Sequence, residues 1–299
     1  MLPLLEDMSI NTSAYKNETR QAIVVVLDAQ ARDPDKAHAA VYEIEDMQTA
    51  RERGFFQFAM VGLSYAGAEL FALGEWGEVR IFSDGTVAEE TVDFDHGPLR
   101  NLATLDGQVH ACGADLQVFR RTGKDAWEEF GPGDALRAEF PGNHLEMIDG
   151  FGAREIYAAG RAGVIWYYDG SVWTPVQTPT NLNYYAVHCG ADGRVYLGGQ
   201  AGVLAFGRGD SFEVLTPDAP VNDVWGVALF DNVVFMAGFR SMVLCNREEF
   251  IPDHEAAARG LGTFYDLHMG ETNLWSFGMK DVMRRTMEQW QRLDAAYVV

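Results

Sequence analysis

A glycine-marked pattern that recurs about every 39 residues constrains the fold of this chain more than any other feature. Residues 156–173 show it most clearly, as three short apolar segments joined by the turns GRAG and YDGS. Glycine suits such turns because it accepts positive φ without a steric penalty. Six copies occur, and each contains a marker glycine at the end of its first segment: Gly74, Gly113, Gly160, Gly199, Gly238 and Gly278.

Each copy predicts four short β-strands in about 40 residues, because one further apolar segment lies upstream of each marker glycine. A four-stranded unit of this size cannot bury both faces of its sheet alone. Units stacked face to face bury them, and closure into a ring protects the strand edges. The repeat therefore predicts an all-β fold, a single β-propeller domain over residues 1–299. A β-sandwich, the alternative for many short strands, would not require the fixed period.

The number of blades depends on the two ends of the chain. Residues 1–54 contain two apolar segments, 22–28 and 39–46, that match the third and fourth strands of a repeat. We expect this hairpin to form a seventh blade together with residues 2–10 and a closing strand within residues 294–299. Six blades with an added hairpin is the alternative.

Six full repeats span residues 55–293 with little variation in length. One gap between marker glycines is 47 residues instead of about 39, and its extra residues, 131–143, contain proline and glycine. We expect these residues to form a loop between blades. Residues 253–260, DHEAAARG, predict one helical turn between the fifth and sixth repeats.

The chain is strongly acidic, with a formal net charge of −21. Such a surface repels nucleic-acid phosphates and anionic lipid headgroups, so neither nucleic acid nor a membrane is an expected partner. It favours a basic protein partner. Solubility alone is the alternative explanation of the charge.

The cysteines and the first residues indicate the compartment. Three cysteines without a CxxC motif fit neither a zinc site nor a disulfide framework, so we expect buried thiols in a reducing environment. The start of the chain lacks the basic and apolar regions of a secretory signal. No apolar segment approaches the length of a membrane span. A cytoplasmic protein is the simplest interpretation.

No motif for catalysis or cofactor binding stands out in the sequence. Asp93, Asp95 and His96 lie in one loop, but no second cluster has matching spacing, so we expect no metal site. The glycine turns lack the GxxxxGK[ST] pattern of a phosphate loop. No Ser/His/Asp or Cys/His arrangement is recognisable. We therefore expect neither a cofactor nor catalytic residues.

Two turns resemble those of known propeller families. Residues 168–173 read YDGSVW and residues 83–87 read SDGTV, downstream of turns of the form GxxGx-apolar. The pattern resembles the Asp-box blades of sialidase-like proteins and the blades of photosystem-assembly-factor-like proteins. Other copies depart from it, as in TGKDAW, GRGDSF and NREEF. The resemblance implies the fold over most of the chain and leaves the function open.

The resemblance implies two alternative functions. A sialidase-like, glycan-processing enzyme needs an arginine cluster, a tyrosine nucleophile and an acid facing the channel, and Arg100, Arg161 and Arg240 are the candidates for the cluster. The chain lacks the Arg-Ile-Pro-type start of that family. An assembly factor for a multi-subunit complex is the other alternative, and it predicts a large client that is not especially basic.

One face of the expected ring carries the turns after the second strands and the loops between blades; we call it the loop face. Aromatic residues and arginines outside the repeat's own aromatic position map to it, and such residues are typical of protein-binding hot spots. The alternatives are that the residues of the first strands plug the channel or line a ligand pocket. The predicted partner-binding residues are Trp76, Arg100, Arg161, Tyr184, Tyr185, Trp225, Phe239, Arg240, Phe264 and Tyr265.

These features together predict a non-catalytic, protein-binding propeller. The acidic charge and the aromatic loop face favour a bacterial immunity-type or adaptor protein that binds and neutralises a basic effector, such as a nuclease toxin. Charge complementarity would speed the association and make it sensitive to salt.

Overall fold

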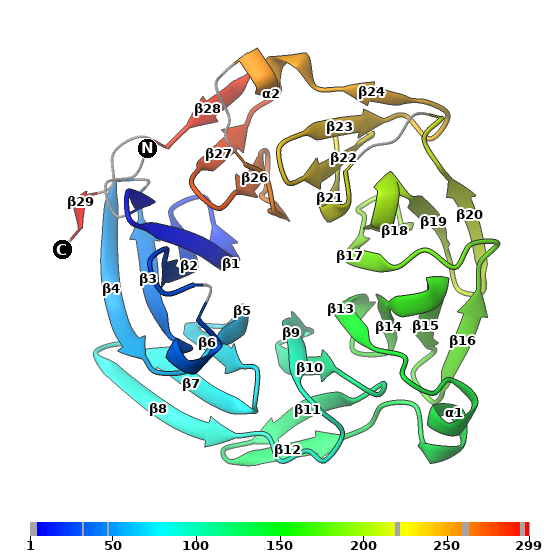
Figure 1. Ribbon diagram of the computed structural model, residues 1–299, viewed down its shortest axis with the longest axis horizontal. Coiled ribbons are helices and arrows are strands. Elements are labelled where there is room, and N and C mark those ends of the chain that lie inside the picture. The colour runs from blue at the N-terminus through cyan, green and yellow to red at the C-terminus, as the bar shows by residue number, and fades with distance from the viewer. Residues whose placement is uncertain are drawn as a thin grey trace.

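Seven β-sheets stand as blades around a central channel in the computed structural model of the chain (Figure 1). The structure describes residues 5–31, 33–46, 48–218, 222–258, 263–293 and 297–298. Within these ranges every blade has four antiparallel strands, which follow one another in chain order from the channel to the rim. The predicted all-β propeller is confirmed, and so is the choice of seven blades over six.

The strands of the first four blades lie within residues 8–177. The first blade contains β1 (Met8–Asn17), β2 (Arg20–Leu27), β3 (Ala39–Glu45) and β4 (Thr49–Phe56). The second contains β5 (Met60–Ala66), β6 (Glu69–Gly74), β7 (Glu78–Ser83) and β8 (Thr86–Thr91). The third contains β9 (Leu99–Leu105), β10 (Gln108–Gly113), β11 (Val118–Gly123) and β12 (Ala126–Glu129). The fourth contains β13 (Leu145–Gly152), β14 (Glu155–Gly160), β15 (Val164–Tyr168) and β16 (Trp173–Gln177).

The last three blades and the C-terminal strand complete the ring. The fifth blade contains β17 (Tyr184–Cys189), β18 (Val195–Gly199), β19 (Leu204–Arg208) and β20 (Ser211–Leu215). The sixth contains β21 (Val224–Phe230), β22 (Val233–Gly238), β23 (Met242–Cys245) and β24 (Phe250–Pro252). The seventh contains β25 (Asp266–Met269), β26 (Leu274–Phe277), β27 (Val282–Arg285) and β28 (Trp290–Arg292), and β29 (Tyr297–Val298) follows.

The marker glycines lie at the end of the second strand, or directly after it, in the second to seventh blades, where the backbone approaches the start of the inner strand. A Cβ on Gly160 would lie 1.8 Å from the carbonyl oxygen of His144, and one on Gly199 would lie 2.0 Å from that of Asn183. The next residue, Arg161, donates its backbone N–H to the His144 carbonyl at 3.1 Å. Equivalent hydrogen bonds join Glu75 to Ala59, Ala114 to Pro98 and Gln200 to Asn183. At Gly113, Gly160, Gly199 and Gly278 only a residue without a side chain permits the approach of the backbone.

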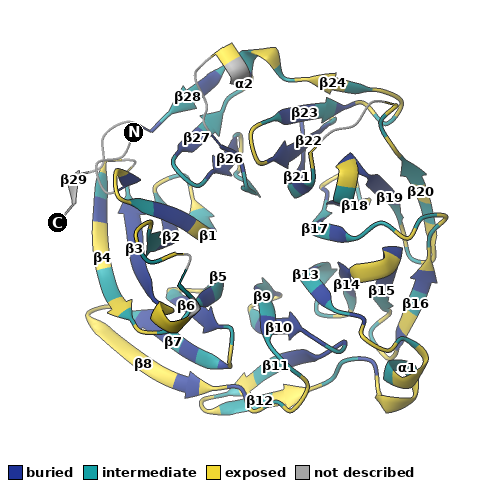
Figure 2. Cartoon of the chain, in the orientation of Figure 1, coloured by how far each residue is buried: buried dark blue, intermediate teal, exposed yellow. Residues whose placement is uncertain are grey.

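The apolar core lies between blades and not in the channel. One buried cluster joins Leu105 and Cys112 of the third blade to Ile156 and Trp166 of the fourth, and similar clusters join the other neighbours. Figure 2 shows the middle strands buried and the rim strands, such as β8, exposed. Each blade therefore gains most of its hydrophobic stabilisation from the sheets beside it.

The ring closes differently from the prediction. Residues 22–28 and 39–46 fall mainly in β2 and β3, the second and third strands of the first blade, so their assignment to the third and fourth strands was wrong. The strand before them was predicted within residues 2–10, whereas β1 spans Met8–Asn17. Its buried serines interrupt the apolar pattern, and Ser9 donates to Asp28 at 2.6 Å. The C-terminal β29 pairs in parallel with β4 as a fifth strand of this sheet. Residues 1–4 lie outside the described ranges.

Two short helices interrupt the β structure at the rim (Figure 1). Helix α1 (Asp134–Glu139) lies in the segment predicted as a loop, and α2 (His254–Ala258) forms the predicted helical turn. Neither helix in the described ranges has the length and apolarity needed to cross a membrane. The cysteines are free thiols, fully buried at Cys112 and Cys245 and half-buried at Cys189.

The close approach at the marker glycines predicts unequal effects of one substitution. We expect Gly199→Ala to lower the free energy of unfolding by about 2–4 kcal/mol, because its Cβ would collide with a backbone carbonyl. The matched variant Gly238→Ala meets the flexible Ser241 side chain at 3.0 Å and should lose less than about 1 kcal/mol. Urea unfolding followed by circular dichroism measures both. Equal losses would contradict this explanation of the repeat.

Candidate functional site

In six blades an extra residue near the start of the inner strand turns one side chain into the channel. In the fifth blade Tyr184 pairs with Gly199 and Ala186 with Gly198, so Tyr185 is bulged out of the register. Such a β-bulge re-aims the side chain. The same shift occurs in the first, second, third, fourth and sixth blades. The residues at this position, here called the channel ring, are Asn11, Val61, Arg100, Glu146, Tyr185, Trp225 and, directly before β25, Tyr265.

The channel ring surrounds a central cavity of about 630 Å³. Three consecutive blades place parallel aromatic rings on one side of it. The ring of Trp225 lies 4.5 Å from that of Tyr185 and 5.3 Å from that of Tyr265, with interplanar angles of 12° and 9°. We call these three residues the aromatic stack. Both faces of Trp225 are covered, so the two tyrosines present the outward faces of the stack.

The rest of the channel ring is mainly polar. Asn11 donates its side-chain amide to the carbonyl of Met60 at 2.7 Å. Arg100 forms an ion pair of 2.8 Å with Glu75, which neutralises its charge. Glu146 makes no hydrogen bond or ion pair through its carboxylate within the part of the chain that the structure describes. The negative charge of Glu146 therefore has no ion-pair partner in the channel ring.

Below the channel ring, a polar cluster joins the first and last blades. The hydroxyl of Ser13 in β1 lies 2.9 Å from both the Asp266 carboxylate and the His268 Nε2 of β25. The Ser13 backbone N–H also donates to Asp266 at 2.8 Å. In a catalytic triad the imidazole lies between hydroxyl and carboxylate, whereas here the hydroxyl lies in the middle. Sequence separation hid this cluster, which links the two ends of the ring.

Burial in the channel shifts the pKa values of the groups below the ring. It raises the pKa of Asp266 to about 6, although Ser13 donates to the carboxylate, and raises that of Asp149 to about 6. Asp149 accepts N–H bonds from Cys189 at 2.7 Å and Gly150 at 2.8 Å. Desolvation lowers the pKa values of His188 and His268 to about 4, so both imidazoles are neutral at pH 7.

The other predicted residues of the loop face lie outside the cavity. Trp76 is 61% exposed and stacks on Phe94 of the neighbouring loop. Phe239 is 40% exposed, with the Arg240 guanidinium 5.5 Å from the centre of its ring. Arg161 is exposed in the turn after β14. These residues lie apart from one another on the loop face, on the same side of the ring as the mouth of the channel.

Tyr184 and Phe264 do not belong to an exposed surface, contrary to the prediction. Both are buried, and Tyr184 contacts the Thr178 hydroxyl at 3.2 Å while Phe264 packs near Trp290 at 6.4 Å between ring centres. Each precedes a residue of the channel ring. In the fifth blade the bulge turns Tyr185 into the channel and leaves Tyr184 packed between blades.

The arginines of the sialidase-like alternative do not converge. Of Arg100, Arg161 and Arg240, only Arg100 lines the central cavity, and it is paired with Glu75. No group of three metal-ligating side chains occurs among the described residues. In the loop considered as a metal site, His96 lies 3.2 Å from Asp115 instead.

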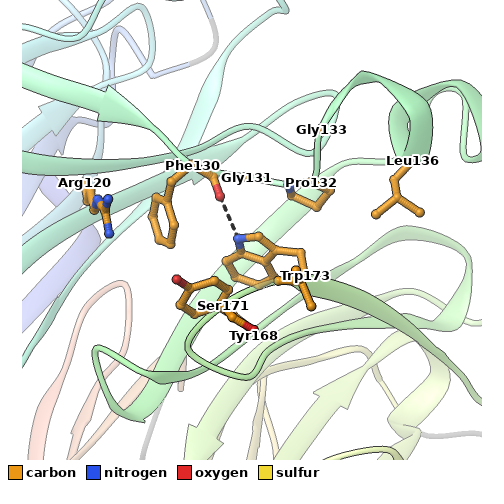
Figure 3. Close-up of a pocket in the computed structure, with 10 residues that line it drawn as sticks. Arg120, Phe130, Gly131, Pro132, Gly133, Leu136, Tyr168, Ser171 and Trp173 are labelled. Atoms are coloured by element: carbon orange, nitrogen blue, oxygen red, sulfur yellow. Dashed lines mark hydrogen bonds between the residues drawn. The ribbon is translucent and has the colours of Figure 1, made fainter.

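A second cavity, of about 460 Å³, lies on the side of the ring between the third and fourth blades (Figure 3). Phe130, Tyr168 and Trp173 line it, and their ring centres lie 5.3–5.9 Å apart. The Trp173 indole donates to the Phe130 carbonyl at 2.8 Å. These side chains pack against one another and the indole N–H has a hydrogen-bond partner. We therefore interpret the cavity as a shallow gap in the packing between the two blades.

Comparison with known proteins identifies relatives by sequence and by fold. The chain is 36% identical over 235 residues to the immune protein Tsi7 of Pseudomonas aeruginosa, and the match covers 74% of each protein. A structure of YCF48 bound to D1 peptide has a TM-score of 0.72 and 16% identity, covering 96% of this chain and 93% of that one. YCF48 from Cyanidioschyzon merolae gives 0.70 and 14%, covering 95% and 97%. No protein-family model matches. The YCF48 structures confirm the resemblance to photosystem-assembly-factor-like blades.

The lowered pKa of His188 makes a prediction about acid stability. Between pH 6.5 and about 4 the unfolded chain binds a proton at this histidine and the folded chain does not, so acidification destabilises the fold. We expect His188→Phe to reduce the loss of unfolding free energy between about pH 7 and 4.5 by about 2 kcal/mol. Urea unfolding at both pH values measures this difference. An unchanged pH dependence would refute the assignment.

Proposed function

This chain belongs to the family of the immune protein Tsi7, and from that membership we propose that it protects a cell by binding and blocking an effector protein. The sequence relationship, which extends over most of both proteins, carries the proposal. The seven-bladed scaffold suits this role, because a wide loop face is available for a partner. Blocking requires no chemistry from the chain, so the proposed action is non-catalytic.

We further propose that the effector is basic and is met in the cytoplasm. The net charge of −21 attracts a partner of opposite sign and speeds its association. Free thiols suit a reducing compartment, where they stay unpaired.

The loop face is the proposed contact surface. Trp76, Phe239 and the aromatic stack lie on this side of the ring, and aromatic anchors supply most of the energy of protein interfaces. The exposed acids Asp93 and Asp95 flank Phe94, on which Trp76 stacks. An effector that docks here would therefore contact aromatic side chains with acidic side chains around them.

Affinity capture with the tagged chain tests the proposal in an extract of its own host. We expect recovery of a basic toxin-type protein, and we expect the affinity of the purified pair to fall at least about tenfold between about 50 and 500 mM NaCl. Growth of cells that express the toxin with and without the chain measures protection. A partner that binds without loss of toxicity, or no partner, would overturn the proposed function.

Charge variants on opposite faces locate the surface. We expect Asp93→Asn with Asp95→Asn to slow association with the captured effector about threefold or more, because steering depends on charge near the contact. The matched control is Asp210→Asn with Glu213→Gln, two exposed acids of the β19–β20 hairpin on the other face. Stopped-flow or surface-based kinetics compare the two. A larger effect of the control pair would place the contact on the opposite face.

A further inference from the structure

We propose that the mouth of the channel is a socket for one cationic side chain of the effector, an arginine or a lysine, held between Glu146 and the aromatic stack. This inference rests on the proposed function and names the chemistry of the partner at one point of the interface. The occupant is a side chain of the docked effector because the mouth opens on the loop face, where the bulged residues begin the inner strands.

The charge of the cavity favours a cation. Its lining contains three carboxyl groups, from Glu146, Asp149 and Asp266, and one guanidinium, that of Arg100. The guanidinium is already paired with Glu75. The two histidines of the lining are neutral at pH 7, because burial holds their pKa values at about 4. A cation entering the channel therefore meets excess negative charge.

Glu146 is the carboxylate nearest to the mouth and the one without a partner. Asp149 and Asp266 both accept hydrogen bonds from backbone N–H groups, whereas Glu146 accepts none within the described ranges. It also lies beside the stack, because Glu146 of the fourth blade and Tyr185 of the fifth take the same bulge position and line the same cavity. After burial and Asp266, its charge contributes to raising the pKa of Tyr265 to about 12. Glu146 is half-buried and has no counter-ion within the described ranges, so a cation of the partner would gain its attraction without displacing an existing ion pair.

The aromatic stack supplies the second wall of the socket. Each of its tyrosines stacks one face on Trp225 and makes no second ring contact within the described ranges. A guanidinium or ammonium over an aromatic face is attracted by the ring's quadrupole, more strongly where water is excluded. The stack and Glu146 thus favour the same chemical group from two sides, and a cavity of about 630 Å³ has room for it.

Two substitutions with matched controls test the socket against the captured effector. We expect Glu146→Gln to raise the Kd about tenfold, because it removes the charge and keeps the shape. Tyr185→Leu should raise it about fivefold, whereas Tyr185→Phe, which keeps the ring face, should bind within about twofold of the wild type. Glu213→Gln, on the opposite face, is the control for net charge. Melting temperatures confirm that every variant is folded.

A double-mutant cycle identifies the occupant. Each arginine and lysine of the effector is replaced by alanine, and we expect one of these changes to lose most of its effect in the Glu146→Gln background. If the wild-type chain binds the effector and Glu146→Gln and Tyr185→Leu bind equally well, the socket is refuted while the proposed function stands. If the wild-type chain binds no effector, the proposed function fails, and the socket fails with it.

Discussion

One backbone hydrogen bond, repeated in the second to fifth blades, holds the loop face to the inner strands. The residue after the marker glycine donates to the carbonyl just before the inner strand, as Gln200 does to Asn183 at 2.8 Å. The contact exists only because the glycine lacks a Cβ, which would lie 2.0 Å from the same oxygen. Where this bond forms, the start of the inner strand is fixed against the turn, and the bulge follows within two residues.

The bulge gives two neighbouring side chains different surroundings. Tyr184 packs between blades with its hydroxyl near Thr178, and Tyr185 enters the channel and stacks on Trp225. The first residue contributes to the apolar core on which every blade depends. The second contributes little to that core, so its identity can vary from blade to blade. The channel ring accordingly runs from asparagine, valine, arginine and glutamate to three aromatic residues.

The sequence predicted those parts of the fold that repeat. The marker glycines and the apolar segments around them indicated six blades because each copy meets the same steric demand. The first blade escaped the pattern because a longer loop with the 3₁₀ turn η2 (Pro34–Lys36) replaces its glycine turn, and because Ser9 and Ser13 in β1 are buried through hydrogen bonds. Apolar periodicity does not detect such a strand.

The candidate site was predicted only in part, because the repeat indicates which positions are unusual but not where the bulge falls. Aromatic residues off the repeat's own position indicated Tyr185, Trp225 and Tyr265, which do come together. Which of Tyr184 and Tyr185 enters the channel depends on a one-residue register shift that adjacency alone does not reveal. Glu146 was missed because no motif or spacing distinguishes one glutamate from the many other acidic residues of the chain. Only its place in the same bulge position distinguishes it from the exposed carboxylates.

The channel keeps charges that a purely structural core would not need. Asp149 and Asp266 have pKa values of about 6 because burial opposes their ionised forms, so the ionised carboxylates weaken the fold at neutral pH relative to mildly acidic pH. Neutral His188 and His268 add no positive charge to offset them. An apolar plug would avoid this cost, since well-packed hydrophobic residues often replace buried charges without loss of stability. The same ionised groups, however, strengthen the attraction for a cation at the mouth. In the proposed socket a positively charged partner would offset this negative charge, and a neutral one would not.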